Sequence, residues 1–244
     1  LGLTRLGHGG TLDPFATGVL PLMAGKSMRL TKQILEHDKT YIAIFQMKTP
    51  VDEDRMDEVI QQLTGRIYNV PPEISAVRVQ VRTRRIHEFQ VLDRNEKHIV
   101  TRIRCEAGTY IRTMAKDMGL LLDQPITLRE LRREDSGNFD LKDCVQLHDI
   151  ADAVWLWKEC NEPEALSRML HPIEKLMTHL PRIIVKDSAV AALAHGAPLL
   201  RPGLVSIPSD LSVGQNILVT SIKGEAVCFV KVNFNSKDIA AMEK

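Results

Sequence analysis

The segment Gly7–Pro14 places a carboxylate in a glycine-rich loop. It combines three glycines with His8 and Asp13, and such a density of glycine marks a loop whose backbone approaches a ligand closely. On these residues alone two interpretations of Asp13 stay open: its carboxylate caps amides in a local turn, or it acts as a catalytic base or nucleophile. A phosphate-binding loop is excluded, because the G-x-x-x-x-G-K-S pattern that ends at Gly25–Ser27 would need glycine at Leu20.

Residues 78–85 form the most basic run of the chain. In an extended strand alternate side chains share a face, and one face of this run carries three arginines, Arg78, Arg82 and Arg84. The other face carries two valines and a threonine. We therefore expect a half-buried strand whose open side meets RNA phosphates. The alternative is a solvated surface, or arginines that pair with acidic groups.

Charge is unevenly distributed along the chain, although the net charge is only +1. Residues 1–48 carry six Lys or Arg against three Asp or Glu, and residues 78–112 carry nine against four. Residues 49–77 carry two against six, and residues 135–180 carry four against nine. If folding brings the basic stretches together, they would form an electropositive face able to hold phosphates. Charge alone also fits a set of solvated surfaces.

The composition is that of a folded globular protein, with 44% hydrophobic and 26% charged residues, and it excludes a disordered or fibrous chain. No apolar run approaches the ~18 residues needed to cross a bilayer, and no signal pattern is present. We therefore expect no membrane partner and a cytoplasmic location.

The first residue is not Met, which indicates that the numbering begins inside a longer gene product. The four cysteines lack a C-x-x-C pair, so we expect free thiols.

The apolar pattern predicts an α+β fold that would position these residues. Alternation predicts strands at 41–45, 89–92 and 99–105. Helical spacing predicts helices over 54–64, 111–122, 141–158 and 163–180. The two later strands flank a polar turn as the arms of a hairpin would. We therefore predict a mixed, largely antiparallel sheet with packed helices.

The sequence changes in character after Leu180. Short apolar strands separated by Gly and Pro are expected at 183–185, 204–207, 217–222 and 227–232, with a short helix at 188–195. We therefore predict two domains, an α+β domain over 1–180 and a small β-rich domain over 181–244.

Four blocks of this sequence resemble the signature elements of TruB-type pseudouridine synthases. The first is Gly7–Pro14 with Thr17–Pro21, which is similar to the segment around the family's catalytic aspartate. The others follow in the family's order: Lys39–Tyr41, Cys105–Arg112 and Leu128–Arg133. Residues from Ile183 onward resemble a PUA domain, the RNA-binding module of this family. The resemblance implies the pseudouridine synthase fold followed by a PUA domain.

The resemblance also implies an activity, the conversion of uridine to pseudouridine within RNA. It makes Asp13 the catalytic aspartate, Arg112 the arginine that pairs with it, and Tyr41 the aromatic plane for the flipped uracil. The residues that match pocket-shaping or RNA-contacting positions are Tyr110, Leu131 and His8. Without the resemblance, Tyr41 and Leu131 would be explained as core residues. No cofactor or metal is implied, because the uracil is only detached, rotated and rejoined.

Further blocks resemble the archaeal and eukaryotic dyskerin-type branch of the family: Leu63–Tyr68, Arg84–Glu88 and Val185–Val190. Two insertions of the bacterial stand-alone enzymes are missing. The resemblance implies an H/ACA guide RNA and small H/ACA partner proteins that help to select the substrate RNA. Because dyskerin-type PUA domains use both ends of the protein, we expect the catalytic domain to lack its N-terminal part. For the same reason we expect the PUA domain to be incomplete at its C-terminus.

Two alternatives to an RNA-guided enzyme stay open. One is a stand-alone modifier of tRNA uridine-55, and the other is a catalytically silent RNA-binding scaffold. The presence of Asp13, Tyr41 and Arg112 favours an enzyme over a scaffold.

Overall fold

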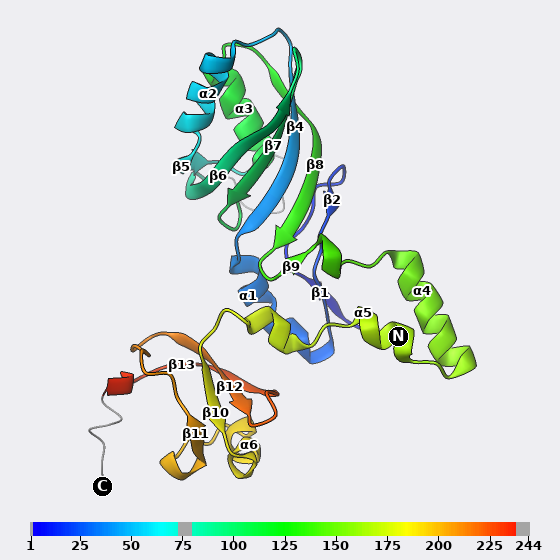
Figure 1. The fold of residues 1–244 in the computed structure, drawn as a ribbon, viewed down its shortest axis with the longest axis vertical. Helices are drawn as coiled ribbons and strands as arrows, with labels where there is room; N and C mark the ends of the chain where they lie inside the picture. The colour runs from blue at the N-terminus through cyan, green and yellow to red at the C-terminus, as the bar shows by residue number, and fades with distance from the viewer. Residues whose placement is uncertain (1, 73–79, 238–244) are drawn as a thin grey trace. The chain divides into compact units, whose positions relative to one another are not determined.

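A computed structural model describes residues 2–72 and 80–237 of the chain. The chain divides into two compact units, residues 1–169 and 170–244, and each is described by itself (Figure 1). The domain boundary at Leu180 stays a prediction. Arg78, one of the expected RNA-contacting residues, lies outside the described residues. Within the described ranges no helix is long and apolar enough to span a membrane.

The first unit is built on a seven-stranded sheet, which confirms the predicted mixed, largely antiparallel fold. Its strands, in order across the sheet, are β2 (Thr17–Gly18), β8 (Ile126–Ser136), β4 (Lys39–Met47), β7 (His98–Cys105), β6 (Arg82–Arg94) and β5 (Gly65–Asn69). The short strand β9 (Phe139–Asp140) pairs with β8. Neighbouring strands are antiparallel except β2 and β8, which run parallel. Strand β4 thus lies between β7 and β8.

Helices α2 (Glu53–Gln62) and α3 (Ile111–Leu121) share the main hydrophobic core with the sheet (Figure 1). Both confirm helices expected from the sequence. The fully buried members of this core include Phe45, Val59, Ile103, Met114 and Met118. Because burying each such side chain contributes roughly 1.5–3 kcal/mol, the core fixes the N-terminus of α3 relative to β4 and β7.

The glycine-rich loop runs between two short antiparallel strands, β1 (Leu6–His8) and β3 (Leu22–Ala24). The amide of Gly9 donates a hydrogen bond of 2.8 Å to the carbonyl of Pro21, which closes the base of the loop. After β3, the 3-10 helix η1 (Gly25–Leu30) and helix α1 (Thr31–Glu36) lead into β4. The loop therefore lies over the end of the sheet where β4 begins.

The sequence pattern does not predict strands β5 and β8. For β8 this failure has a physical reason. Its pairing with β4 contains two irregularities, at which Arg129 and Glu134 are extra residues without a partner in β4. These bulges break the alternation of apolar and polar residues that marks a strand. As a result Leu128, Leu131 and Arg133 pair with residues of β4 that share one face.

The helices expected over 141–158 and 163–180 are wrong in their bounds. The structure has η2 (Leu141–Asp143), α4 (Leu147–Trp155), the π-helix η3 (Leu156–Cys160), α5 (Glu164–Met169) and η4 (Ile173–Met177). Capping boxes at Asp140 and Gln146 begin new helices and so interrupt a continuous one. The expected apolar face is not buried either, since Leu147 is 80% exposed.

The second unit contains a four-stranded sheet, which confirms the predicted small β-rich domain. Its strand order is β11 (Leu204–Ser206), β10 (Arg182–Val185), β12 (Asn216–Ser221) and β13 (Ala226–Lys231). Strands β10 and β12 are parallel and the other pairs are antiparallel. Helix α6 (Asp187–Ala194) follows β10, as expected, and a 3-10 turn, η5 (Arg201–Gly203), precedes β11. The sheet has its own core around Val185, Ile217 and Val219.

Candidate active site

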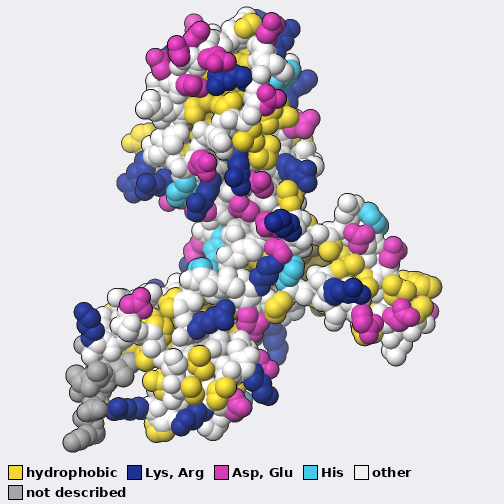
Figure 2. All heavy atoms as spheres, in the orientation of Figure 1, with side chains coloured by type: hydrophobic (Ala, Val, Ile, Leu, Met, Phe, Trp, Pro, Cys, Tyr) yellow, Lys and Arg dark blue, Asp and Glu magenta, His cyan; other side chains and the backbone are white. Residues whose placement is uncertain are grey.

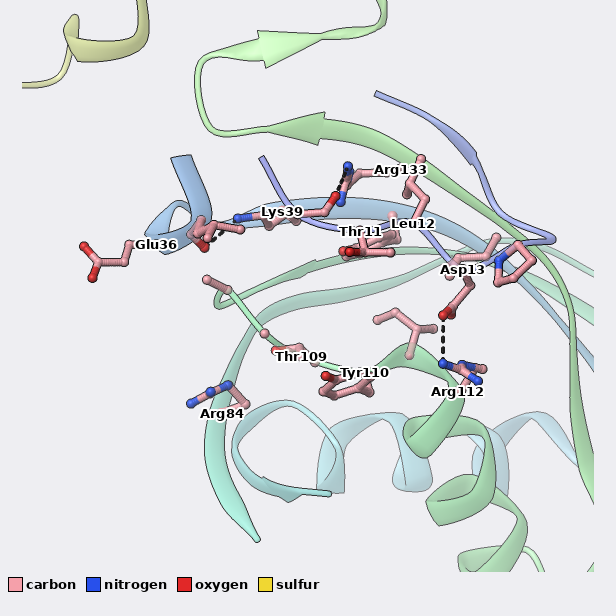
Figure 3. Close-up of a pocket in the computed structure, with 18 of the residues that line it drawn as sticks. Thr11, Leu12, Asp13, Glu36, Lys39, Arg84, Thr109, Tyr110, Arg112 and Arg133 are labelled. Carbon is pink, nitrogen blue, oxygen red and sulfur yellow. Dashed lines mark hydrogen bonds and ion pairs between the residues drawn. The ribbon is translucent and has the colours of Figure 1, made fainter. Parts of the chain in front are cut away.

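A cavity of about 1070 Å³ lies in the first unit, between the glycine-rich loop and the N-terminus of α3 (Figure 3). Its walls come from the loop at residues 10–14, helix α1, the start of β4, the turn at residues 107–110 and strand β8. Asp13, Tyr41, Tyr110, Leu131 and Arg112 all line it. The structure therefore brings together five residues that the sequence assigned to one site.

Asp13 and Arg112 form an ion pair at the edge of this cavity. The Nη2 atom of Arg112 lies 2.8 Å from Oδ1 of Asp13, and about a quarter of each side chain is exposed (Figure 3). Asp13 belongs to the loop, where its carbonyl accepts a hydrogen bond of 2.8 Å from the amide of Ala16. Arg112 belongs to the first turn of α3. The guanidinium therefore orients a carboxylate that water and substrate can still reach.

Tyr41 is a half-buried residue of β4, between Ile103 of β7 and Arg133 of β8. Burial raises the pKa of its phenol to about 12, because the phenolate would lose its hydration, while the nearby cation of Arg133 opposes this rise. Tyr41 therefore offers the cavity a protonated hydroxyl at neutral pH.

Tyr110 is held in place by the side chain of Asn69, a residue without a role in the sequence analysis. The amide of Tyr110 donates to Asn69 Oδ1 at 2.9 Å, and Asn69 Nδ2 donates to the carbonyl of Tyr110 at 3.2 Å. Asn69 is 1% exposed. This pair of bonds joins β5 to the N-cap residue of α3, two positions before Arg112. A buried asparagine at a strand end is the sequence signal that could have indicated such a contact.

The remaining predicted site residues lie in different places. Leu131 lines the cavity and belongs to the hydrophobic core as well. His8 is exposed on β1, and it is not among the residues that line the cavity. Arg84 lines the cavity, and its guanidinium lies over Gly108. Its Nε is buried without a hydrogen-bond partner among the described residues. Arg82 is half-buried on the same strand.

The expected faces of the arginine-rich strand are wrong in one respect. Val81 is 60% exposed and Thr83 is exposed too, whereas Arg82 and Arg84 are half-buried. The face that carries the two arginines continues to the buried Ile86, because alternate residues of β6 point to the same side. The cavity at this end of the sheet explains why arginines occupy the inner face.

Basic side chains do not gather on one face in the view of Figure 2, where acidic and basic side chains are interspersed. Three arginines of strands β6 and β7 lie within ion-pair distance of carboxylates: Arg94, Arg102 and Arg104. Much of the positive charge of the sheet is therefore locally balanced. The cations of Lys39, Arg84 and Arg133 line the cavity instead.

Lys39 and Arg133 are cavity residues to which the sequence analysis gave no role, although both stand in blocks that resemble the family. Lys39 is 5% exposed, and its Nζ donates hydrogen bonds to the carbonyls of Ile34, Leu35 and His37 at the end of α1. Burial, together with the cation of Arg133, lowers its pKa to about 8. A lysine at the start of an apolar strand pattern is the signal that could have indicated Lys39. Arg133 stands among charged residues of β8, so no comparable signal marks it.

Among the described residues, no three His, Cys, Asp or Glu side chains lie close enough together to hold a metal ion. The groups that the described cavity offers for chemistry include the Asp13 carboxylate, the Tyr41 phenol and the surrounding cations. A carboxylate fixed by a guanidinium can act as a nucleophile or a base, and a protonated phenol can transfer a proton.

Comparison with protein families accounts for the whole chain. Residues 1–111 match the N-terminal domain of TruB family pseudouridylate synthase. Residues 112–178 match the tRNA pseudouridylate synthase B C-terminal domain, and residues 181–244 match the PUA domain. The chain belongs to the TruB family of pseudouridylate synthases. The resemblance that the sequence blocks indicated is thus confirmed, including the PUA domain.

Several archaeal relatives resemble the chain over its full length. It is 38% identical over 244 residues to a probable tRNA pseudouridine synthase B of Methanocaldococcus jannaschii, covering 100% of this chain and 73% of the relative. A protein of the same description from Pyrobaculum aerophilum is also 38% identical, with the same coverage.

Two solved structures resemble the fold closely. A Cbf5-Nop10-Gar1 complex contains a chain with a TM-score of 0.87 and 36% identity, covering 99% of this chain and 74% of that one. An H/ACA RNP bound to a substrate RNA containing 2′-deoxyuridine also has a TM-score of 0.87, with 34% identity. That match covers 99% of this chain and 73% of the solved one. The described fold is therefore that of the Cbf5 pseudouridine synthase.

Proposed function

We propose that this protein isomerises uridine to pseudouridine in RNA and that Asp13 is its catalytic carboxylate. The observation that carries this proposal is the ion pair of Asp13 with Arg112 at the edge of a cavity that Tyr41 also lines. Membership of the TruB family supports the reaction type. The cavity of about 1070 Å³ is large enough for a flipped nucleotide.

The reaction breaks the C1′–N1 bond, keeps the uracil in place, and rejoins C1′ to C5, after which C5 loses a proton and N1 gains one. In one route Asp13 attacks C1′, the bonding electrons leave with N1 of uracil, and C5 later displaces the carboxylate. In the other route Asp13 removes the C2′ proton as the C1′–N1 bond breaks, which leaves a C1′=C2′ double bond; C5 then bonds to C1′ while Asp13 returns the proton to C2′. Both routes need an ionised and oriented carboxylate, which the guanidinium of Arg112 provides at 2.8 Å.

Tyr41 would hold the flipped uracil and move a proton. Its ring lines the cavity from β4, where it can stack on a base. Since burial keeps the pKa of the phenol at about 12, the hydroxyl is protonated at neutral pH. In this proposal the hydroxyl relays the proton that leaves C5 after C1′ has been rejoined. Phenylalanine at this position would stack but could not relay.

Arg84 and Arg82 would hold the RNA backbone at the mouth of the cavity. Arg84 lines the cavity and is half-buried, so its guanidinium could meet a phosphate there. Arg82 lies on the same face of β6, two residues away. These contacts would position the RNA without reading its sequence.

Guide-dependent target selection belongs to this proposal. The resembling Cbf5 structures are complexes with Nop10 and Gar1, or an H/ACA RNP bound to a substrate RNA. We infer that this chain works with an H/ACA guide RNA and small partner proteins of that kind, and that its PUA domain contributes to RNA binding. A cytoplasmic location remains a prediction.

A second candidate function is stand-alone modification of tRNA, which the descriptions of the archaeal relatives as probable tRNA pseudouridine synthase B favour. The experiment incubates the full-length protein with bare tRNA, or with guide RNA, partners and a matched substrate, and maps pseudouridine. We expect modification in the guided reaction. Equal rates on bare tRNA would overturn guide dependence while leaving the enzymatic activity intact.

The same assay tests the catalytic carboxylate. Asp13→Asn keeps the size of the side chain and removes the anion, so we expect pseudouridine formation to fall to background while RNA affinity stays within about threefold. Asp152→Asn, on the exposed side of α4, is the matched control and should keep full activity. Turnover by Asp13→Asn would remove Asp13 from its role, and an inactive but RNA-binding wild type would indicate a silent scaffold.

A further inference from the structure

Arg133 is an almost completely buried arginine on β8, at the back of the cavity. It is 1% exposed and is the largest of the fully buried side chains. Among the described residues it forms no ion pair with a carboxylate, and its guanidinium donates to two backbone carbonyl oxygens. A buried cation is unfavourable unless hydrogen bonds compensate for the lost water, so its presence indicates a task that an apolar residue would not perform.

The two carbonyls that Arg133 holds lie on either side of Asp13. Its Nη2 donates to the carbonyl of Gly10 at 3.0 Å, three residues before the aspartate (Figure 3). Its Nε donates to the carbonyl of Val19 at 2.7 Å, six residues after the aspartate. One planar guanidinium therefore joins both ends of the loop that carries the carboxylate, and its donors are fixed relative to each other.

The backbone of Arg133 holds the same loop. The amide of Val19 donates to the carbonyl of Arg133 at 2.9 Å, where β2 pairs with β8. The preceding Gly18 has φ +103, and a Cβ there would lie 2.1 Å from the carbonyl oxygen of Arg133. The loop thus approaches β8 closely beside Arg133, where a side chain at residue 18 would not fit.

Arg133 also lies beside the aromatic residue of the site. Tyr41 and Arg133 are directly opposed in the antiparallel pair of β4 and β8, so their side chains share one face of the sheet. Arg133 therefore binds the loop of Asp13 and is the cross-strand neighbour of Tyr41.

We propose that Arg133 is a positioning residue of the pseudouridine synthase reaction, which fixes the Asp13 loop relative to the strands β8 and β4 and so relative to Tyr41. This inference rests on the proposed function, because it gives Arg133 a role only through Asp13 and Tyr41. It does not require Arg133 to touch RNA.

The test compares Arg133→Met with Arg132→Met, the exposed neighbouring arginine on β8, in the full protein with its guide RNA and partners. We expect Arg133→Met to lower the single-turnover rate about 100-fold or more, since displacements near 1 Å have such effects, while the Kd for RNA stays within about threefold. Hydrogen exchange at residues 10–19 should become faster in this variant. Arg132→Met should match wild type in all three measurements.

Chemical rescue separates positioning from a general loss of structure. In Arg133→Ala, added guanidinium ion should restore part of the reaction rate and slow hydrogen exchange at residues 10–19. It should not restore the rate of Asp13→Asn.

If Arg133→Met does not fold, Arg133→Lys takes its place. One ammonium cannot hold both carbonyls, so a loss of rate of about tenfold is expected. Because Tyr41 is the cross-strand neighbour of Arg133, the two substitutions should couple, and Arg133→Met should have a smaller effect on the rate in Tyr41→Phe than in wild type.

The outcomes distinguish this inference from the proposed function. If Arg133→Met and Arg133→Lys keep rates within threefold of the Arg132→Met control while Asp13→Asn is inactive, the positioning role is wrong and the proposed function stands. A loss of rate that is fully explained by weaker RNA binding, without rescue, would also overturn it. If Asp13→Asn stays active, the proposed catalytic role of Asp13 fails, whatever the Arg133 variants do.

Discussion

Arg112 donates a hydrogen bond of 2.8 Å to Asp13 across 99 residues of sequence, and this contact joins the glycine-rich loop to the first turn of α3 (Figure 3). The two residues reach each other by different means. The loop is held against β8 by Arg133, and α3 is held by its buried face in the core. Both partners of the pair therefore have fixed supports, and their mutual orientation is set before substrate binds.

Removing the cation of this pair should slow the reaction without weakening RNA binding. In Arg112→Gln, Asp13 loses its charged partner and one hydrogen bond, so we expect the single-turnover rate to fall about 100-fold or more. Arg55→Gln is a suitable control, because Arg55 forms an exposed ion pair with Glu58 on α2. Pseudouridine mapping at saturating protein would measure the rate. An Arg112→Gln variant as fast as the control would show that the ion pair has no catalytic importance.

Tyr41→Phe should retain the bound base and lose the proton relay. The ring still stacks, so RNA affinity should stay within about threefold, while formation of pseudouridine should fall about 100-fold, the usual contribution of a positioned acid or base. Base release assays would detect any uracil that is detached and not rejoined. Full activity of Tyr41→Phe would restrict Tyr41 to stacking.

The raised pKa of Tyr41 gives a pH prediction. A phenol whose pKa is raised by burial to about 12 keeps its proton as pH rises, so its donor form does not decline between about pH 7 and pH 10. The single-turnover rate of wild type should therefore show no loss from tyrosine ionisation in this range. A fall with a midpoint near pH 9 or 10 that is absent in Tyr41→Phe would contradict this environment for the phenol.

Phosphate contacts by Arg82 and Arg84 should appear in the salt dependence of RNA binding. If both hold phosphates, the double variant Arg82→Gln/Arg84→Gln should weaken binding to all RNA sequences alike. The slope of log affinity against log salt should flatten by up to about 0.7–0.9 for each arginine that no longer binds a phosphate. A control with Arg168→Gln, on α5, removes the same kind of charge elsewhere. An unchanged slope with poorer folding would indicate a structural role for the two arginines.

The sequence was sufficient to predict that Asp13, Tyr41 and Arg112 meet in this cavity, because the glycine-rich block and the later blocks resemble one family. It also placed His8 at the site, although His8 does not line the cavity. The supports of these residues were harder to predict. Arg133 and Lys39 bind backbone carbonyls, and a carbonyl is present in every residue, so its position leaves no trace in the sequence. Such contacts become visible only when the fold brings the chain segments together.

The same difference applies to the helices and strands: some are predicted by their own sequence pattern, and others depend on pairing with a distant segment. Helices α2 and α3 follow from apolar spacing, because their buried faces repeat with the helical period. Strand β8 has bulges at Arg129 and Glu134, which destroy the period of two, and only its pairing with β4 restores a common face. The apolar spacing around Leu147 predicted burial that the described structure does not show.

The buried Lys39 predicts a specific pH dependence of stability. Burial, and to a smaller extent the cation of Arg133, lowers its pKa from 10.5 in the unfolded chain to about 8 in the fold. Between about pH 8 and 10.5 the unfolded state therefore binds more protons than the folded state, so this lysine makes the protein more stable as pH rises. Below about pH 8 both states are protonated and the penalty of the buried charge is constant.

Comparison with Lys39→Met isolates this effect, since methionine has a similar length and no charge. The free energy of unfolding of wild type minus that of Lys39→Met should increase by about 1–2 kcal/mol between pH 7 and pH 9.5, as measured by urea unfolding. The variant also leaves the carbonyls of Ile34, Leu35 and His37 without their donor. The cost of these lost hydrogen bonds does not change with pH in the way that the titration of Lys39 does. Lys32→Met, at an exposed position of α1, should show no such pH-dependent difference. If the difference in free energy of unfolding between wild type and Lys39→Met stays constant or decreases over this range, the fold does not lower the pKa of Lys39.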